Sequence, residues 1–127
     1  MKQTTIFFSV IIVLILGSIM TFLVNNKQDN TLSRYDTFAQ CLKDKGATFY
    51  GAFWCPHCKA EKKLFGTSVH LLPYVECSTS NGSAQTQICI DKKITGYPTW
   101  EFIDGSRLTG EVALDKLADK TQCILPQ

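Results

Sequence analysis

The sequence has almost no net charge, no internal repeat and no low-complexity segment. Its 13 basic and 11 acidic residues leave a formal charge of +2 at pH 7. A stripe of basic residues interleaved with aromatics, the usual sign of a nucleic-acid-binding surface, is missing as well. We therefore expect no nucleic-acid partner, and the length of 127 residues predicts one folded domain.

The first part of the chain lacks charge altogether. Residues 6–24 contain no charged side chain, and a helix of that length just spans a hydrocarbon core of roughly 30 Å. A cleaved signal peptide would have an apolar region of about 7–15 residues and a small-x-small site. This run is longer, no such site follows it, and no nearby cysteine indicates a lipoprotein. The expected organisation is a short cytoplasmic N-terminus (1–5), a transmembrane anchor (6–24), a polar tether (25–34) and a domain (35–127).

The compartment is indicated by the cysteines rather than by flanking charges. Lys2 precedes the apolar run and Lys27 follows it, so the positive-inside rule gives little preference. Six cysteines form an even set in a short chain, which is typical of oxidising compartments. We expect a single-pass protein of the cell membrane with its soluble domain on the extracytoplasmic side.

The rest of the chain predicts a mixed α/β domain. Ser33 and Asp36 form a capping-box pattern and Gly46 suits a helix end. Pro73 favours an edge position or a bulge for the strand that contains it, and Asp104-Gly105 marks a hairpin. The predicted elements are a helix (33–46), a strand (47–54), a helix (55–66), a strand (70–77), a short helix (86–93), two hairpin strands (98–110) and a helix (113–120).

The stretch Cys55-Pro56-His57-Cys58 carries the chemistry. It follows a predicted strand and opens a helix, because proline is well tolerated at the first helical position. The free N–H groups and the positive end of the helix dipole favour a thiolate at Cys55. His57 adds a positive charge or a hydrogen-bond donor. We expect Cys55 to be an exposed nucleophile and Cys58 to be the resolving thiol buried beneath it.

Zinc binding and a purely structural disulfide are the alternatives for this motif. Cys55, Cys58, Cys77 and Cys89 could supply four ligands, but ribbon-type zinc sites place the second pair as another tight knuckle. The eleven residues between Cys77 and Cys89 do not. We predict no metal site, and the structural disulfide stays open as an alternative.

"FWCPHC", followed about forty residues later by "GYPTWEF", resembles the thioredoxin superfamily. With "YVEC", "QICIDKKITGYPTWEF" and "LADKTQC", residues 35–123 look like the thioredoxin-like domain fused to, or encoded beside, bacterial and plastid vitamin K epoxide reductase homologues. The resemblance implies a thioredoxin-like fold, a central mixed sheet flanked by helices, and no cofactor. It also implies a redox partner of the vitamin K epoxide reductase type.

The resemblance implies roles for further residues. Pro98 would be a cis-proline, and Tyr97 would present its backbone to a substrate strand near Cys55. Trp54 would pack beside the nucleophile, although a core aromatic at a strand end is an equal alternative. Cys77 and Cys89 would form a structural or relay disulfide. In such an arrangement the first and last helices end at the pole away from the site, so we expect Cys41 to pair with Cys123.

The sequence departs from typical thioredoxins before the motif. Residues 47–53 contain no aspartate, whereas thioredoxins bury an acid there that assists the resolving thiol. Glu76 is the nearby candidate on a neighbouring strand, and we expect it to be a solvated charge at a strand end. The proton acceptor of Cys58 is therefore unassigned. His70 has no partner in the sequence and is expected to be structural.

These features predict a membrane-anchored thiol–disulfide oxidoreductase that donates disulfides to reduced substrate proteins. A vitamin K epoxide reductase-like membrane protein would re-oxidise it. The Pro56-His57 dipeptide resembles that of oxidising, DsbA-type proteins and supports this direction. One alternative is a thiol reductase for cytochrome maturation or repair. Another is an anchored, non-enzymatic binding module whose cysteine pair is a structural disulfide.

Overall fold

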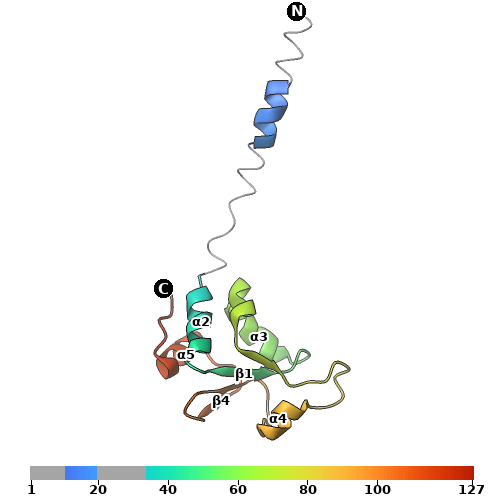
Figure 1. The fold of residues 1–127 in the computed structure, drawn as a ribbon, viewed down its shortest axis with the longest axis vertical. Coiled ribbons are helices and arrows are strands. Elements are labelled where there is room, and N and C mark those ends of the chain that lie inside the picture. The colour runs from blue at the N-terminus through green and yellow to red at the C-terminus, as the bar shows by residue number, and fades with distance from the viewer. Residues whose placement is uncertain (1–10, 20–33) are drawn as a thin grey trace, which may run out of the picture. The chain divides into compact units, whose positions relative to one another are not determined.

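The computed structural model describes residues 11–19 and 34–127 (Figure 1). Residues 11–19 are helical. Within the described parts of the chain, no helix is both long and apolar enough to cross a bilayer. The predicted anchor (6–24) and tether (25–34) lie largely outside the described residues, as do Ser33 and the predicted N-terminus (1–5).

A four-stranded mixed sheet organises residues 34–127. The strand order is β2-β1-β3-β4, with β1 parallel to β2 and antiparallel to β3, and β3 antiparallel to β4. This sheet confirms the predicted mixed α/β class. The strands are β1 (Thr48–Gly51), β2 (Tyr74–Glu76), β3 (Thr99–Glu101) and β4 (Arg107–Thr109).

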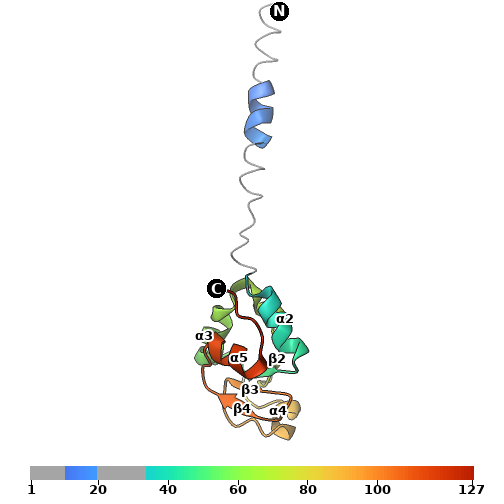
Figure 2. The ribbon, with the colours of Figure 1, turned by 90° about the vertical axis from the view of Figure 1, so that its left-hand side faces the viewer.

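Helices flank both faces of the sheet, as Figures 1 and 2 show. Side chains of α2, α3 and α5 join the main core, together with Phe49 and Trp100 from the sheet. The short helix α4 packs on the opposite face, where Cys89 contacts a smaller cluster around Tyr50. The helices are α2 (Asp36–Asp44), α3 (Pro56–Leu64), α4 (Gln87–Asp91) and α5 (Leu114–Thr121).

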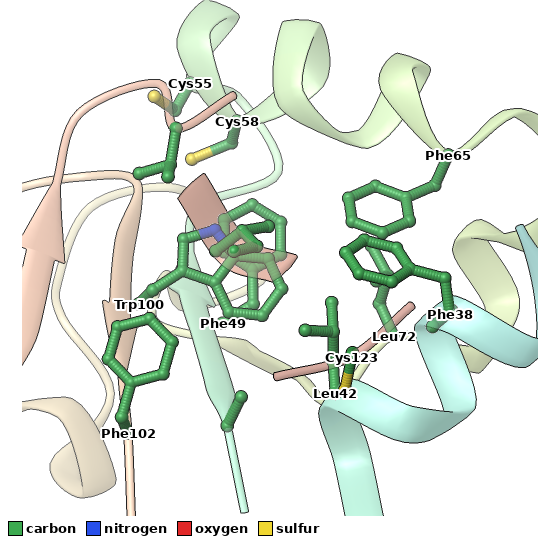
Figure 3. Close-up of a cluster of buried hydrophobic side chains, with 14 of the residues drawn as sticks. Phe38, Leu42, Phe49, Cys55, Cys58, Phe65, Leu72, Trp100, Phe102 and Cys123 are labelled. Carbon is green, nitrogen blue, oxygen red and sulfur yellow. The ribbon is translucent and has the colours of Figure 1, made fainter. Parts of the chain in front are cut away.

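The main core is aromatic and ends at the two motif cysteines. The Phe49 and Trp100 rings stack with centroids 4.8 Å apart, and Phe65 contacts Trp100 from α3's C-terminal end. Figure 3 shows Cys55 and Cys58 at one end of this cluster and Cys123 at the other. The site is thus built directly on the packed interior.

The predicted strand at 70–77 is only partly correct. Residues Gly66–Leu71 form a 3-10 helix, η1, and the strand β2 starts at Tyr74. Pro73 precedes this strand and has no N–H to contribute to a sheet ladder. As predicted, the strand lies at an edge of the sheet.

The predicted capping box is wrong with respect to Asp36. The helix α2 begins after Tyr35 without a side-chain cap. The Asp36 carboxylate instead accepts a hydrogen bond of 2.5 Å from the hydroxyl of Ser68, which is buried in η1. Asp36 therefore makes a tertiary hydrogen bond to η1 instead of the capping hydrogen bond within its own helix.

Candidate active site

Cys55 caps the N-terminus of α3, as the sequence predicted. Its backbone is extended (φ −70°, ψ 121°), and Pro56 occupies the first turn. The Cys55 carbonyl accepts the backbone N–H of Lys59 at 3.2 Å, while its own N–H donates to Ala52 at 3.0 Å. These bonds fix the thiol at the junction between β1 and α3.

The predicted exposure of Cys55 is wrong, because only 5% of the residue is accessible. Its Sγ donates towards the Tyr97 carbonyl oxygen at 3.8 Å, so the segment before Pro98 covers it. Phe53 and Trp54 beside it are about half exposed. Cys55 therefore lies in a shallow recess with aromatic side chains at its rim.

Cys58 lies one turn further along α3 and is almost fully buried, as predicted. Burial raises the pKa of its thiol to about 12, and the hydrogen bond with Cys55 adds to the rise, although a backbone bond near Ala52 opposes it. Both motif cysteines are free thiols here. A Cys58 thiolate is thus costly to form without help from a neighbouring group.

The structure brings Trp54, Tyr97 and Pro98 together around Cys55. The Tyr97–Pro98 peptide bond is cis, and the Trp54 and Tyr97 rings meet edge to face with centroids 6.1 Å apart. The Trp54 indole N–H donates to the Ser78 hydroxyl at 2.8 Å. Trp54 is therefore a surface residue beside Cys55, and the alternative of a core aromatic is wrong.

His57 points away from the core and forms a hydrogen-bond contact with Glu111 that the sequence did not predict. Its Nδ1 lies 2.6 Å from Oε1 of Glu111, and both side chains are at least half exposed. Glu111 precedes α5 and is 54 positions away in the sequence. Exposed pairs of this kind contribute little to the stability of the fold. The contact therefore acts mainly by orienting the imidazole beside the cysteines.

The four other cysteines form two disulfides, Cys77–Cys89 and Cys41–Cys123. Neither Cys77 nor Cys89 has any accessible surface. Thiol–disulfide exchange needs direct attack on a sulfur atom, so this geometry favours the structural role over the relay.

Glu61 is a buried residue that the sequence analysis missed. Its carboxylate accepts the Trp100 indole N–H at 2.6 Å and the Val112 backbone N–H at 3.0 Å. Burial raises its pKa, although both hydrogen bonds oppose the rise. Helical spacing could have indicated its burial, because Glu61 follows Cys58 by three residues and precedes the buried Phe65 by four.

The expectation that Glu76 is a solvated charge is wrong. Its Oε1 accepts the backbone N–H groups of Phe53 at 3.2 Å and Ser78 at 2.9 Å. Its Oε2 accepts the Tyr74 hydroxyl at 2.7 Å. The strand end is tied to the loop that leads into the motif.

His70 contacts the Thr67 carbonyl oxygen through Nδ1 at 2.6 Å, a local contact on the exposed side of η1.

Gly51 makes room for the Cys58 thiol. A Cβ atom there would lie 2.9 Å from Cys58 Sγ and 2.9 Å from Tyr74 Cε2. Because both neighbours are packed, we expect Gly51→Ala to lower the free energy of unfolding by about 1–3 kcal/mol. Urea denaturation measures the change.

Gly96→Ala is the matched control for this substitution. A Cβ at Gly96 would meet only the Thr109 methyl group at 3.4 Å, so the expected change is within about 0.5 kcal/mol. Equal stabilities of the Gly51 and Gly96 variants would contradict the close packing at Cys58.

No family model matches the chain. A search of curated proteins finds thiol-disulfide oxidoreductase LTO1 of Arabidopsis thaliana, 42% identical over 93 residues. The match covers 70% of this chain and 24% of that protein, so the chain spans about a quarter of the length of this curated relative. The similarity supports a thioredoxin-like redox domain around Cys55 and Cys58.

Proposed function

We propose that this protein is a membrane-anchored thiol–disulfide oxidoreductase that donates disulfides to reduced substrate proteins. The observation that carries the proposal is the position of Cys55 and Cys58 at the start of α3, facing the segment before Pro98. The relative named thiol-disulfide oxidoreductase supports the reaction class. The Pro56-His57 dipeptide supports the donor direction.

The reaction balances as two successive exchanges. A substrate thiolate attacks Sγ of Cys55, the Cys55–Cys58 bond breaks, and Cys58 leaves as a thiolate that takes up a proton. A second substrate thiolate then attacks the mixed disulfide and releases Cys55. The substrate loses two electrons and the enzyme gains them.

A pocket of about 200 Å³ beside the nucleophile would receive a substrate side chain. Trp54 and Tyr97 line it, together with the loop that the Cys77–Cys89 disulfide closes. Among the residues that the structure describes, the Tyr97 carbonyl accepts a hydrogen bond only from the Cys55 thiol, over a long distance of 3.8 Å. A substrate strand passing the cis-proline would meet backbone at Tyr97 and an aromatic wall at Trp54.

The location and the partner are further parts of the proposal. The uncharged run at residues 6–24 supports an anchor, and the two disulfides support an oxidising, extracytoplasmic compartment. The motif resemblance supports re-oxidation by a vitamin K epoxide reductase-like membrane protein. Anchoring would raise the effective concentration of enzyme and partner in the same bilayer.

Trapping of mixed disulfides tests the proposal. We expect Cys58→Ala to accumulate covalent complexes through Cys55 in cells, because the thiol that resolves them is missing. Complexes with substrate proteins and with the re-oxidising membrane protein should both appear on non-reducing gels and disappear on reduction. Mass spectrometry of the captured chains identifies each class.

The double variant Cys55→Ser, Cys58→Ala is the control and should capture nothing. Absence of complexes with Cys58→Ala would favour the non-enzymatic binding module. A reduction potential of the Cys55–Cys58 pair nearer to about −120 mV agrees with a donor. A potential near about −270 mV would instead favour the reductase.

A further inference from the structure

Each catalytic cycle creates or consumes a thiolate at a buried sulfur, and β1 provides no acid to exchange the proton. Glu61 is buried on the same helix, but its two oxygens accept N–H groups from Trp100 and Val112. Glu76 is bound to the backbone of Phe53 and Ser78 and to the Tyr74 hydroxyl. Neither carboxylate has a described contact with Cys58.

Lys62 is placed for this task by the helix itself. It follows Cys58 by four residues on α3, and side chains at this spacing are neighbours, with Cβ atoms roughly 5–6 Å apart. The Lys62 side chain is partly buried. Its ammonium group is therefore directed along the same side of α3 as the thiol, away from the exposed Lys63.

The ring of Tyr74 brings Lys62 and Cys58 to the same place. Lys62 Nζ lies 3.2 Å from the centroid of this ring. The edge of the ring and Cys58 Sγ both come within 2.9 Å of the point where a Gly51 side chain would start. The ammonium group therefore lies over a ring whose edge is near the thiol, and the two groups interact electrostatically.

Glu76 fixes the ring in this position. The Tyr74 hydroxyl donates to its carboxylate at 2.7 Å, and two backbone N–H groups hold that carboxylate. Tyr74 also packs edge to face on Phe49, with centroids 5.4 Å apart. The tyrosine is thereby clamped at both ends while Lys62 rests on its face.

We propose that Lys62 is the proton donor and acceptor of Cys58, positioned by the Tyr74 ring and, through it, by Glu76. When a substrate thiolate breaks the Cys55–Cys58 bond, the electron pair goes to Cys58 Sγ. A proton then moves from Lys62 Nζ to that sulfur, which leaves a neutral amine and a thiol. Solvent returns the proton to the amine, and re-oxidation runs the transfer in reverse.

The electrostatic environment agrees with this direction of transfer. Burial raises the pKa of Cys58 to about 12, whereas burial lowers the pKa of Lys62, with Glu76 and Cys58 opposing that change. The proton therefore prefers sulfur once the disulfide has opened. The titratable groups of the neighbouring elements are Cys55, Tyr74 and Glu76, with Tyr50 of β1 coupled to Glu101 and His70 of η1 bound to Thr67.

Reduction of the oxidised full-length protein by dithiothreitol, from about pH 6 up to the ordinary lysine pKa of about 10.4, tests the proposal. Rates are divided by the dithiothreitol thiolate concentration, so that the remaining pH dependence belongs to the protein. We expect the corrected wild-type rate to fall as pH rises and the Lys62 ammonium is lost. Lys62→Met should be at least about a hundredfold slower at pH 7, the lower end of the range of general acid catalysis, with a flat pH profile.

Lys62→Arg separates proton transfer from simple charge. Arginine keeps the positive charge but stays protonated throughout this range, so this variant should be nearly as slow as Lys62→Met and equally flat. Lys63→Met, on the exposed side of α3, should keep the wild-type rate and profile. A wild-type rate in Lys62→Arg, or equal rates in the Lys62→Met and Lys63→Met variants, would overturn the proposal.

This inference rests on the proposed function only through the Cys55–Cys58 disulfide. The dithiothreitol assay needs no substrate protein and no membrane partner. Failure of Cys58→Ala to capture complexes would contradict the proposed function and leave the Lys62 profile intact. Conversely, captured complexes together with an unaltered Lys62→Met rate would reject Lys62 alone.

Discussion

Replacing Cys41 and Cys123 by alanine should lower the free energy of unfolding by roughly 4.5 kcal/mol. The two residues are 82 positions apart, and in the chain-entropy model a cross-link over so long a loop strongly restricts the unfolded chain. The loss is a large part of the stability of a small domain, which is commonly about 5–15 kcal/mol. Urea denaturation under non-reducing conditions measures it.

The second disulfide supplies the comparison. Cys77 and Cys89 are only 12 positions apart, so replacing both by alanine should cost about 3 kcal/mol by the same reasoning. Cys123 directly follows the C-terminal cap of α5, and Cys41 is on α2. The Cys41 and Cys123 variant should therefore lose more free energy of unfolding than the Cys77 and Cys89 variant. The opposite order would contradict the conclusion that the disulfide over the longer loop stabilises the fold more.

Glu61→Ala should lower the free energy of unfolding by roughly 4 kcal/mol. It removes the acceptor for two N–H groups, those of Trp100 and Val112. Leaving a buried donor unpaired costs about 1–3 kcal/mol each, and the lost side chain adds a cavity. Glu61→Gln keeps one acceptor oxygen and should lose about half as much.

Glu61 also gives the stability a pH dependence of known sign. Its pKa is raised in the folded protein, mainly by burial, so the folded state holds this proton more tightly than the unfolded chain. Its contribution is fully present below the ordinary glutamate pKa of about 4.3 and is lost as pH rises through the raised value. The stability difference between wild type and Glu61→Gln should therefore shrink with rising pH, and a constant difference would contradict it.

The local parts of the fold and site were predictable because short-range chemistry determines them. Proline at the first turn places Cys55 at a helix start, and Asp104-Gly105 turns the hairpin, where Gly105 has φ +77°. Each of these features needs only a few adjacent residues. The resemblance to the thioredoxin superfamily added the expectation of a cis peptide bond before Pro98.

The contacts around Cys58 were not predictable in the same way. Glu61 and Glu76 are ordinary charged residues in the sequence. Their hydrogen bonds in the folded protein come from donors of Trp100, Val112 and Phe53 that lie 23 to 51 positions away. Helical spacing does place Glu61 and Lys62 one turn from Cys58. It cannot show that the ring of Tyr74, from the neighbouring strand β2, lies beside both Lys62 and Cys58.

The two edge strands of the sheet limit how this protein can pair with unfolded chains. The strands β2 and β4 are three residues long each, and Pro73 stands directly before β2. Such short edges offer an unfolded chain few backbone groups for strand pairing. Under the proposed function, a reduced substrate protein would be bound through one disulfide bond and a few side chains, and strand pairing with the enzyme would not lead to co-aggregation.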